Sequence, residues 1–209
     1  KNLRQNRKNK RFVYLISPNK IKSEGFYSKL NQVLSSKKVS FFQLRLKNES
    51  FKNKIYIGKR IKKICKKYKV KLLINDDPLI AKKINADGCH LGQKDMNILS
   101  ARKILKNKII GVTCHNSINL AKKAILNHAN YLAFGAFYSS KTKKTKYKAN
   151  LKILRLAKKL TNIPIVAIGG IKDSNYKKLL LNKANFLAIS SYIWNNKKLN
   201  PKEAIKKLK

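Results

Sequence analysis

The sequence predicts an α/β fold in which eight short strands alternate with helices. Eight apolar runs recur at intervals of roughly 25 residues, and amphipathic, lysine-rich stretches lie between them. The runs show no polar alternation, which is typical of parallel strands covered on both faces. These repeats favour a single-domain (β/α)8 TIM barrel over residues 11–209, after a basic N-terminal tail at residues 1–10. A doubly wound open sheet is the alternative.

Each element is predicted from its own run of residues. The strands are expected at 11–17, 39–46, 70–75, 87–92, 109–113, 131–137, 163–169 and 185–190. The clearest helices between them are expected at 28–38, 53–69, 119–129 and 150–160, with their lysines solvated. A barrel carries its functional residues at the C-terminal ends of its strands. Polar residues gather at those ends: Arg45, Lys47, Asn75, Asp76, His90, Gln93, Asp95, Thr113, Ser140, Thr142, Lys143, Gly169, Gly170, Ser190 and Ser191.

The charge of the chain is extreme. Lys and Arg total 51 against 8 Asp and Glu, a formal net charge of +43. Phosphate neutralisation dominates nucleic-acid binding. Here, however, the charge is almost all lysine and runs along the entire chain, whereas dedicated binders gather arginine and aromatic residues on one face. We therefore expect no specific nucleic-acid partner, and we expect the charge to attract small anions.

Location and assembly are predicted only coarsely. No apolar run approaches the ~18–20 residues of a membrane-spanning helix, so no membrane partner is expected. The 3 cysteines, Cys65, Cys89 and Cys114, make an odd number, which fits a reducing cytoplasm better than a disulfide framework. A monomer and a homo-oligomer stay open as alternatives.

Four of the 8 acids lie between residues 75 and 96. Asp77, followed by a proline, is expected to be a helix N-cap, and Asp87, at the start of a strand, a turn or cap residue. Asp76 and Asp95 follow neighbouring strands, which lie about 4.8 Å apart, so their carboxylates can converge. We expect the surrounding lysines to lower their pKa values, so that neither acts as an acid or base. Two ionised oxygen ligands suit Mg²⁺; the alternative is a pair of solvated carboxylates bound to lysines.

Two groups of residues suit anions. Arg45 ends a strand and can hold two phosphate oxygens at once. The loop 137–150 carries hydroxyls and lysines without an acid. Glycines follow the seventh strand and serines the eighth, where barrels commonly bind phosphate. The sequence therefore predicts two anion sites, one with a metal and one without.

Two Cys-His pairs, at residues 89–90 and 114–115, raise the question of zinc. Adjacent strand residues point to opposite faces, so neither pair closes easily on one ion. We expect the two cysteines to face the helices and His90 to face the barrel mouth.

Six segments, taken in order, resemble the thiamine phosphate synthase (thiamine-phosphate pyrophosphorylase) family. They are "FFQLRLK", "LLINDD", "ADGCHLGQKDM", "IIGVTCHN", "FGAFYSSKTK" and "IPIVAIGGI". The resemblance covers nearly the whole chain after the basic tail. It implies a TIM-barrel transferase that joins hydroxymethylpyrimidine pyrophosphate to a thiazole phosphate, giving thiamine monophosphate and pyrophosphate.

The resemblance also implies roles for individual residues. Asp76 and Asp95 would hold Mg²⁺. The pyrophosphate would be held by Gln43, Arg45, Lys47, Asn75, Thr113 and Lys143, with Gln43 and His90 near the pyrimidine. The thiazole phosphate would be held by Ser140, Thr142, Gly170, Ser190 and Ser191. The thiazole nitrogen has its own lone pair, so no base needs to activate it.

Other functions stay open at this point. A thiazole tautomerase shares the barrel and could use His115 as its acid or base. The retention of Asp76, Asp95 and Lys143 favours the synthase, because an isomerase has no pyrophosphate to bind. A non-enzymatic binder of a phosphorylated ligand or of nucleic acid is the third class.

Overall fold

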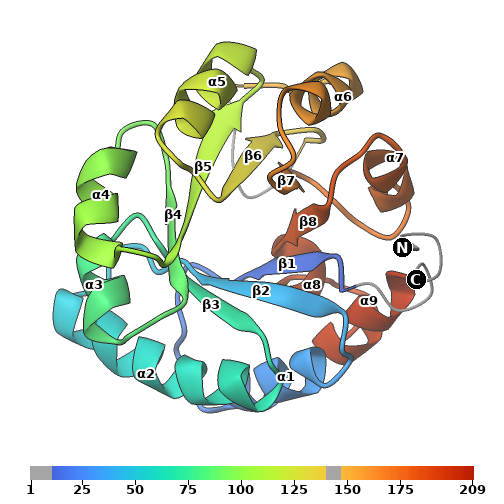
Figure 1. The fold of residues 1–209 in the computed structure, drawn as a ribbon. Coiled ribbons are helices and arrows are strands. Elements are labelled where there is room, and N and C mark those ends of the chain that lie inside the picture. The colour runs from blue at the N-terminus through green and yellow to red at the C-terminus, as the bar shows by residue number, and fades with distance from the viewer. Residues whose placement is uncertain (1–10, 140–146) are drawn as a thin grey trace, which may run out of the picture.

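The computed structural model describes residues 11–139 and 147–209, and in them eight parallel strands close into a barrel (Figure 1). The strands are β1 (Val13–Ile16), β2 (Val39–Leu44), β3 (Lys71–Asn75), β4 (Gly88–Leu91), β5 (Ile109–His115), β6 (Tyr131–Gly135), β7 (Ile165–Ile168) and β8 (Phe186–Ile189). They pair in chain order, and β1 closes the ring by pairing with β8 from Val13↔Leu187 to Leu15↔Ile189. The predicted barrel is confirmed, and the open sheet is wrong. The basic tail lies outside the described residues.

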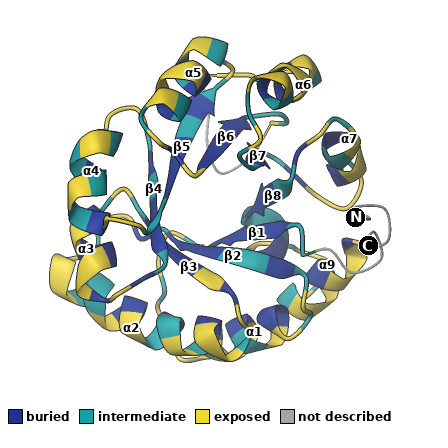
Figure 2. Ribbon diagram, in the orientation of Figure 1, coloured by how far each residue is buried: buried dark blue, intermediate teal, exposed yellow. Residues whose placement is uncertain are grey.

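Helices surround the strands on the outside (Figure 1). They are α1 (Gly25–Leu34), α2 (Phe51–Lys67), α3 (Pro78–Lys83), α4 (Ile98–Leu105), α5 (Ile118–Leu126), α6 (Leu151–Leu160), α7 (Tyr176–Leu181), α8 (Ser191–Trp194) and α9 (Pro201–Lys207). Figure 2 shows that their outward faces are exposed and that their inward faces are buried against the strands. The expected solvated, lysine-rich faces are confirmed. None of the helices in the described part of the chain is long and apolar enough to cross a membrane.

Several predicted boundaries differ from the observed ones. The runs at 11–17 and 163–169 give strands of four residues, because apolar side chains continue past the hydrogen-bonded ladder. β5 is longer than predicted and reaches His115, with an irregular register between Thr113 and His115. Polar residues still lie at or just beyond the strand ends, as the barrel requires.

The apolar core has two layers. The outer layer fills the space between strands and helices and includes Cys89 and Cys114, both fully buried. The inner layer fills the barrel and includes Tyr14, Leu73 and Tyr131. The two cysteines therefore face the helices, as expected, away from the barrel interior.

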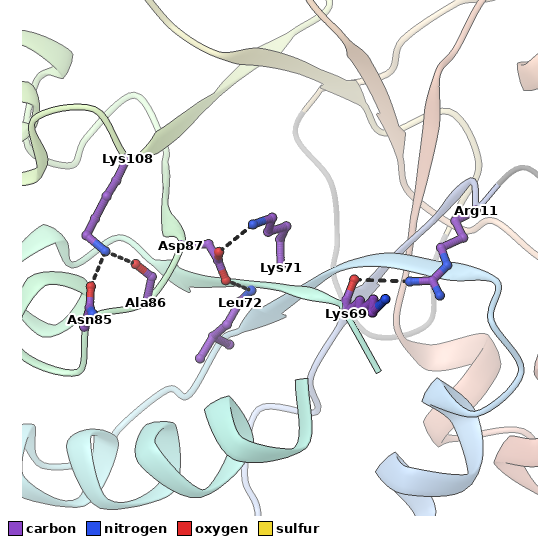
Figure 3. Close-up of polar contacts among 8 residues, drawn as sticks. All are labelled: Arg11, Lys69, Lys71, Leu72, Asn85, Ala86, Asp87 and Lys108. Carbon is purple, nitrogen blue, oxygen red and sulfur yellow. Dashed lines mark hydrogen bonds and ion pairs between the residues drawn. The ribbon is translucent and has the colours of Figure 1, made fainter. Parts of the chain in front are cut away.

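The N-terminal end of the barrel is held by polar contacts (Figure 3). Asp87 accepts a hydrogen bond from the Leu72 backbone N–H at 2.8 Å and pairs with the Lys71 ammonium at 3.1 Å. The ammonium of Lys108 donates to the side-chain oxygen of Asn85 at 2.6 Å and to the Ala86 carbonyl. Asp87 is therefore structural, as predicted, because it joins β3 to the start of β4 at the end opposite the strand C-termini.

Asp77 is the N-cap of α3. Its carboxylate accepts a hydrogen bond from the Ile80 backbone N–H at 3.0 Å, and Pro78 occupies the first helical position. The expectation for Asp77 is confirmed, since this contact satisfies one of the backbone donors that a helix leaves unpaired at its start.

Replacing Asp77 by alanine should cost about 1 kcal/mol of unfolding free energy and leave turnover largely intact. The loss arises because the first turn of α3 loses its side-chain acceptor. Urea unfolding measures the stability, and steady-state rates measure the turnover. A large fall in turnover with unchanged unfolding would show that Asp77 belongs to the functional site.

Candidate active site

Asp76 and Asp95 meet at the C-terminal ends of β3 and β4. Asp76 directly follows β3 with a left-handed backbone (φ 64°), and its N–H donates to the His90 carbonyl on β4 at 2.8 Å. Asp95 is fixed by its own loop, where one carboxylate oxygen accepts from the Gly92 N–H at 2.6 Å. The carboxyl groups of Asp76 and Asp95 lie within hydrogen-bonding contact of each other. The predicted convergence is thus confirmed.

The expected pKa direction for Asp76 is wrong. Although the residue stands at the exposed barrel mouth, desolvation of its carboxyl is the largest cause that raises its pKa, to about 6. The hydrogen bond to Asp95 and the negative charge of Asp95 raise the pKa further, while Arg45 lowers it. The lysines of the chain are dispersed over the outer wall, and the nearer carboxylate outweighs them. Two carboxyls in this arrangement need a shared proton or a cation between them.

Oxygen donors alone make up this pair. Within the residues that the structure describes, no group of three or more His, Cys, Asp and Glu side chains could hold a metal ion. The two carboxylates would therefore hold a metal cation whose remaining coordinating atoms come from water or from a bound small molecule. That donor set, hard oxygens with an incomplete protein shell, fits Mg²⁺ and does not fit zinc.

Arg45 stands beside the acid pair, just after β2. Its guanidinium donates to the Asn19 side-chain oxygen at 2.7 Å, and its backbone N–H donates to the Ser17 hydroxyl at 2.9 Å. The residue is half-buried, and its charge reaches Asp76. Lys47 is exposed, and its backbone N–H donates to the Asn19 carbonyl at 3.1 Å. The guanidinium of Arg45 is therefore held next to the two carboxylates, at the C-terminal end of the barrel strands.

Three predicted site residues lie inside the barrel and are linked by two tyrosines. The Gln43 amide donates to the Tyr14 hydroxyl at 3.0 Å, and this hydroxyl lies 2.7 Å from that of Tyr131. The Tyr131 hydroxyl lies 2.7 Å from Nδ1 of His90, whose Nε2 lies 2.8 Å from Oγ1 of Thr113. Burial lowers the pKa of His90 to about 4, so the imidazole is neutral at pH 7. Asn75, at the end of β3, hydrogen-bonds with the carboxyl of Asp76.

The ends of β7 and β8 form a second group. Gly169 and Gly170 follow β7 with φ values of 109° and 61°. A Cβ atom at Gly170 would lie 2.6 Å from the Ser139 carbonyl oxygen, so only glycine allows the two loops to approach this closely. Ser190 follows β8 and donates from its hydroxyl to the Ser17 carbonyl at 3.3 Å, and Ser191 begins α8. Backbone groups and serine hydroxyls therefore lie together at the neighbouring ends of β7 and β8. Ser140, Thr142 and Lys143, which the sequence also places in this region, lie outside the described residues.

A hollow of about 310 Å³ opens beside β5 and the start of α5. It is lined by Gln93, His115, Asn116, Ser117, Leu120 and Tyr147. The His115 ring stacks on that of Tyr147 with centroids 4.0 Å apart. His115 is the residue that a thiazole tautomerase could use as its acid or base.

Tyr14, Tyr131 and Gly92 were missed by the sequence analysis. Each tyrosine sits in an apolar run and reads as core, and nothing in a separation of 117 residues indicates that their hydroxyls meet. Gly92 contacts Asp95 closely, since a Cβ atom there would lie 2.8 Å from an Asp95 oxygen. Its place inside the segment "ADGCHLGQKDM" is the signal in the sequence that could have found it.

A closed barrel with charged and polar side chains gathered at the C-terminal ends of its strands defines the class of TIM-barrel enzymes. A family model described as "Thiamine monophosphate synthase" matches residues 13–193. The chain is 74% identical over 207 residues to a thiamine-phosphate synthase of Pelagibacter ubique (strain HTCC1062), covering 99% of this chain and 100% of the relative. The chain belongs to the thiamine monophosphate synthase family.

Further comparisons agree with this assignment. A thiamine-phosphate synthase of Hyphomonas neptunium is 37% identical over 190 residues, covering 88% of this chain and 86% of the relative. A solved thiamine phosphate pyrophosphorylase from Pyrococcus furiosus superposes with a TM-score of 0.84 at 28% identity, covering 96% of this chain and 94% of that one. A 3-hexulose-6-phosphate synthase from Salmonella typhimurium, at 15% identity and a TM-score of 0.68 over 94% of this chain and 96% of that one, shares the fold alone.

Proposed function

We propose that the chain joins hydroxymethylpyrimidine pyrophosphate to a thiazole phosphate, giving thiamine monophosphate and pyrophosphate, with Mg²⁺ as its cofactor. The family and the full-length relative support the reaction. The observation that carries the site is the contact between the Asp76 and Asp95 carboxyls beside Arg45. An acid pair of this kind is suited to a cation, and the neighbouring guanidinium is suited to the anion that the cation would share.

In this proposal Asp76 and Asp95 hold Mg²⁺, while Arg45, Lys47 and Thr113 face the pyrophosphate. Mg²⁺, when bound, supplies positive charge that stabilises pyrophosphate as it leaves. The carbon–oxygen bond to pyrophosphate breaks with its electron pair on oxygen, and the thiazole nitrogen forms the new carbon–nitrogen bond with its own lone pair. The protein therefore needs fixed cations and donors more than a base. Gln43, Asn75 and His90 would lie beside the pyrimidine and pyrophosphate.

The second anion would be the thiazole phosphate. Gly170, Ser190 and Ser191 lie at the neighbouring ends of β7 and β8 and could hold it through backbone N–H groups and hydroxyls. Assignment of Ser140 and Thr142 to this phosphate, and of Lys143 to pyrophosphate, is a prediction from the sequence. Small phosphorylated molecules are thus the proposed partners. A cytoplasmic location is supported by Cys65, Cys89 and Cys114, which are all free thiols.

The direct test combines the purified protein with both substrates and Mg²⁺. We expect thiamine monophosphate and pyrophosphate to form in equal amounts, and chelation of Mg²⁺ to stop the reaction. Chromatography of thiamine monophosphate after oxidation to its fluorescent derivative gives the rate, and a coupled assay gives the pyrophosphate.

Omitting one substrate separates the alternatives. Without the pyrimidine substrate, a synthase leaves the thiazole phosphate unchanged, whereas a tautomerase converts one thiazole isomer into another. Isomer conversion without any thiamine monophosphate in the full mixture would overturn the proposed function and direct attention to His115.

A further inference from the structure

The polar groups inside the barrel form one unbroken hydrogen-bonded series across five strands. Its members, in order, are Gln43 on β2, Tyr14 on β1, Tyr131 on β6, His90 on β4 and Thr113 on β5. Its first three members are 2% to 3% exposed, so water does not satisfy their polar atoms. The hydroxyl protons of Tyr14 and Tyr131 must therefore find their partners within the series.

The series has a direction. The Gln43 nitrogen carries only protons, so it donates and the Tyr14 oxygen accepts. A phenol has one proton, and that of Tyr14 has the Tyr131 oxygen as its remaining partner. Tyr131 in turn donates to Nδ1 of His90. The opposite direction would leave the Tyr14 proton buried without an acceptor, which is unfavourable for a polar group removed from water.

This direction fixes the far end of the series. A neutral imidazole that accepts at Nδ1 carries its proton on Nε2, which then donates to the Thr113 oxygen. With its oxygen engaged by His90, the Thr113 hydroxyl has a proton to donate elsewhere. Thr113 is half-buried near the end of β5, on the side where the strands carry the acid pair. Anionic oxygens bind such donors.

We propose that Tyr131 and Tyr14 are positioning residues that hold His90 as its Nε2–H tautomer, so that the Thr113 hydroxyl donates to an anionic oxygen of the ligand at the barrel mouth. The identity of that ligand as a pyrophosphate rests on the proposed function. The tautomer does not, because it is a property of the chain without ligand.

The space for Tyr131 is provided by Gly111, its neighbour on β5. A Cβ atom at position 111 would lie 1.8 Å from Cζ of the Tyr131 ring. The His90 ring also lies against the Tyr131 ring, with centroids 5.7 Å apart and planes 19° apart. Confined rings keep their hydroxyls in place before the ligand arrives, which is the condition for effective charge stabilisation.

The first experiment is nitrogen NMR of the unliganded protein labelled at histidine. In the wild-type protein, His90 is expected to be protonated at Nε2 and unprotonated at Nδ1. Tyr131→Phe removes the donor to Nδ1 and should give a mixture of tautomers. Gln43→Glu, which replaces the donor by an acceptor of the same shape, should reverse the series and move the proton to Nδ1. A His90 protonated at Nδ1 in wild type, or unchanged by both substitutions, overturns the proposal.

The second experiment measures the affinity for inorganic pyrophosphate with Mg²⁺. Thr113→Val should weaken binding about tenfold, the equivalent of one hydrogen bond, whereas Thr113→Ser should bind nearly as wild type. Tyr131→Phe should weaken binding by a smaller factor, set by the fraction of molecules in which His90 has lost the Nε2–H tautomer. The double variant should bind about as weakly as Thr113→Val alone, because both changes remove the same donor. Additive losses would overturn the proposal. Absence of thiamine monophosphate formation, with these tautomers and affinities as expected, would overturn the proposed function alone.

Discussion

Replacing either Asp76 or Asp95 by asparagine should lower Mg²⁺-dependent turnover at least about a hundredfold. Each substitution keeps the shape of the side chain and removes one of two anionic oxygens that meet at the ends of β3 and β4. Without Mg²⁺ the variants should melt no lower than wild type above about pH 6, because a raised pKa makes the ionised Asp76 a destabilising group at higher pH. Steady-state rates across a Mg²⁺ titration and thermal melts at pH 8 measure both effects.

Asp77→Asn is the matched control. It makes the same chemical change one residue away, and asparagine is as good an N-cap as aspartate, so both turnover and melting should stay near wild type. Full activity in both Asp76→Asn and Asp95→Asn would remove the metal assignment. Equal losses in all three variants would show that the change in charge, and no specific ligand, is responsible.

Arg45→Ala should cost several kcal/mol of transition-state stabilisation, in the range of about 3 kcal/mol found when a charge-stabilising donor is removed. The guanidinium is held by Asn19 beside the acid pair, where the leaving group is proposed to develop its charge. Binding to oligonucleotides should barely change in Arg45→Ala, because it would depend on many exposed lysines of the outer wall. Such binding should also weaken strongly as salt is added. Turnover and oligonucleotide affinity are measured together, at low and physiological salt.

Arg60→Ala provides the matched control for Arg45. Arg60 lies on α2 in the helix layer and pairs with the exposed Glu24, a contact that contributes little to stability. Its loss should leave turnover within about twofold of wild type. Tight oligonucleotide binding that survives physiological salt and falls only with Arg45→Ala, in proteins without turnover, would contradict the enzyme assignment.

The sequence predicts most of the architecture because the strands of a barrel are covered on both faces and are therefore continuously apolar. Continuous apolar runs gave all eight strands, and the Asp77-Pro78 pair gave the start of α3. Their ends were less certain, as at β5, because residues such as His115 stay in the ladder despite being polar. Two other helix starts were predicted less well: α2 begins at Phe51 after the cap Ser50, and α6 begins at Leu151 after the cap Asn150, where helices at 53–69 and 150–160 were expected.

Environment is what the sequence could not supply. The convergence of Asp76 and Asp95 followed from strand order, but the sign of the pKa shift depended on desolvation and on their contact, neither of which spacing reveals. Tyr14 and Tyr131 lie inside the barrel, where their rings pack in the inner apolar layer and their hydroxyls bond to each other. A tyrosine in an apolar run gives no sign of which atoms will face its own hydroxyl.

Gly111 limits the order in which this chain could change over generations. Any side chain at position 111 would overlap the Tyr131 ring, so a Gly111→Ala mutation is incompatible with the tyrosine in its present place. A lineage could fill position 111 only after position 131 had already exchanged its ring for a smaller group. The two substitutions can therefore occur in one order only. Restoring tyrosine at position 131 afterwards would be blocked, because the methyl group at position 111 would occupy the space that the ring needs.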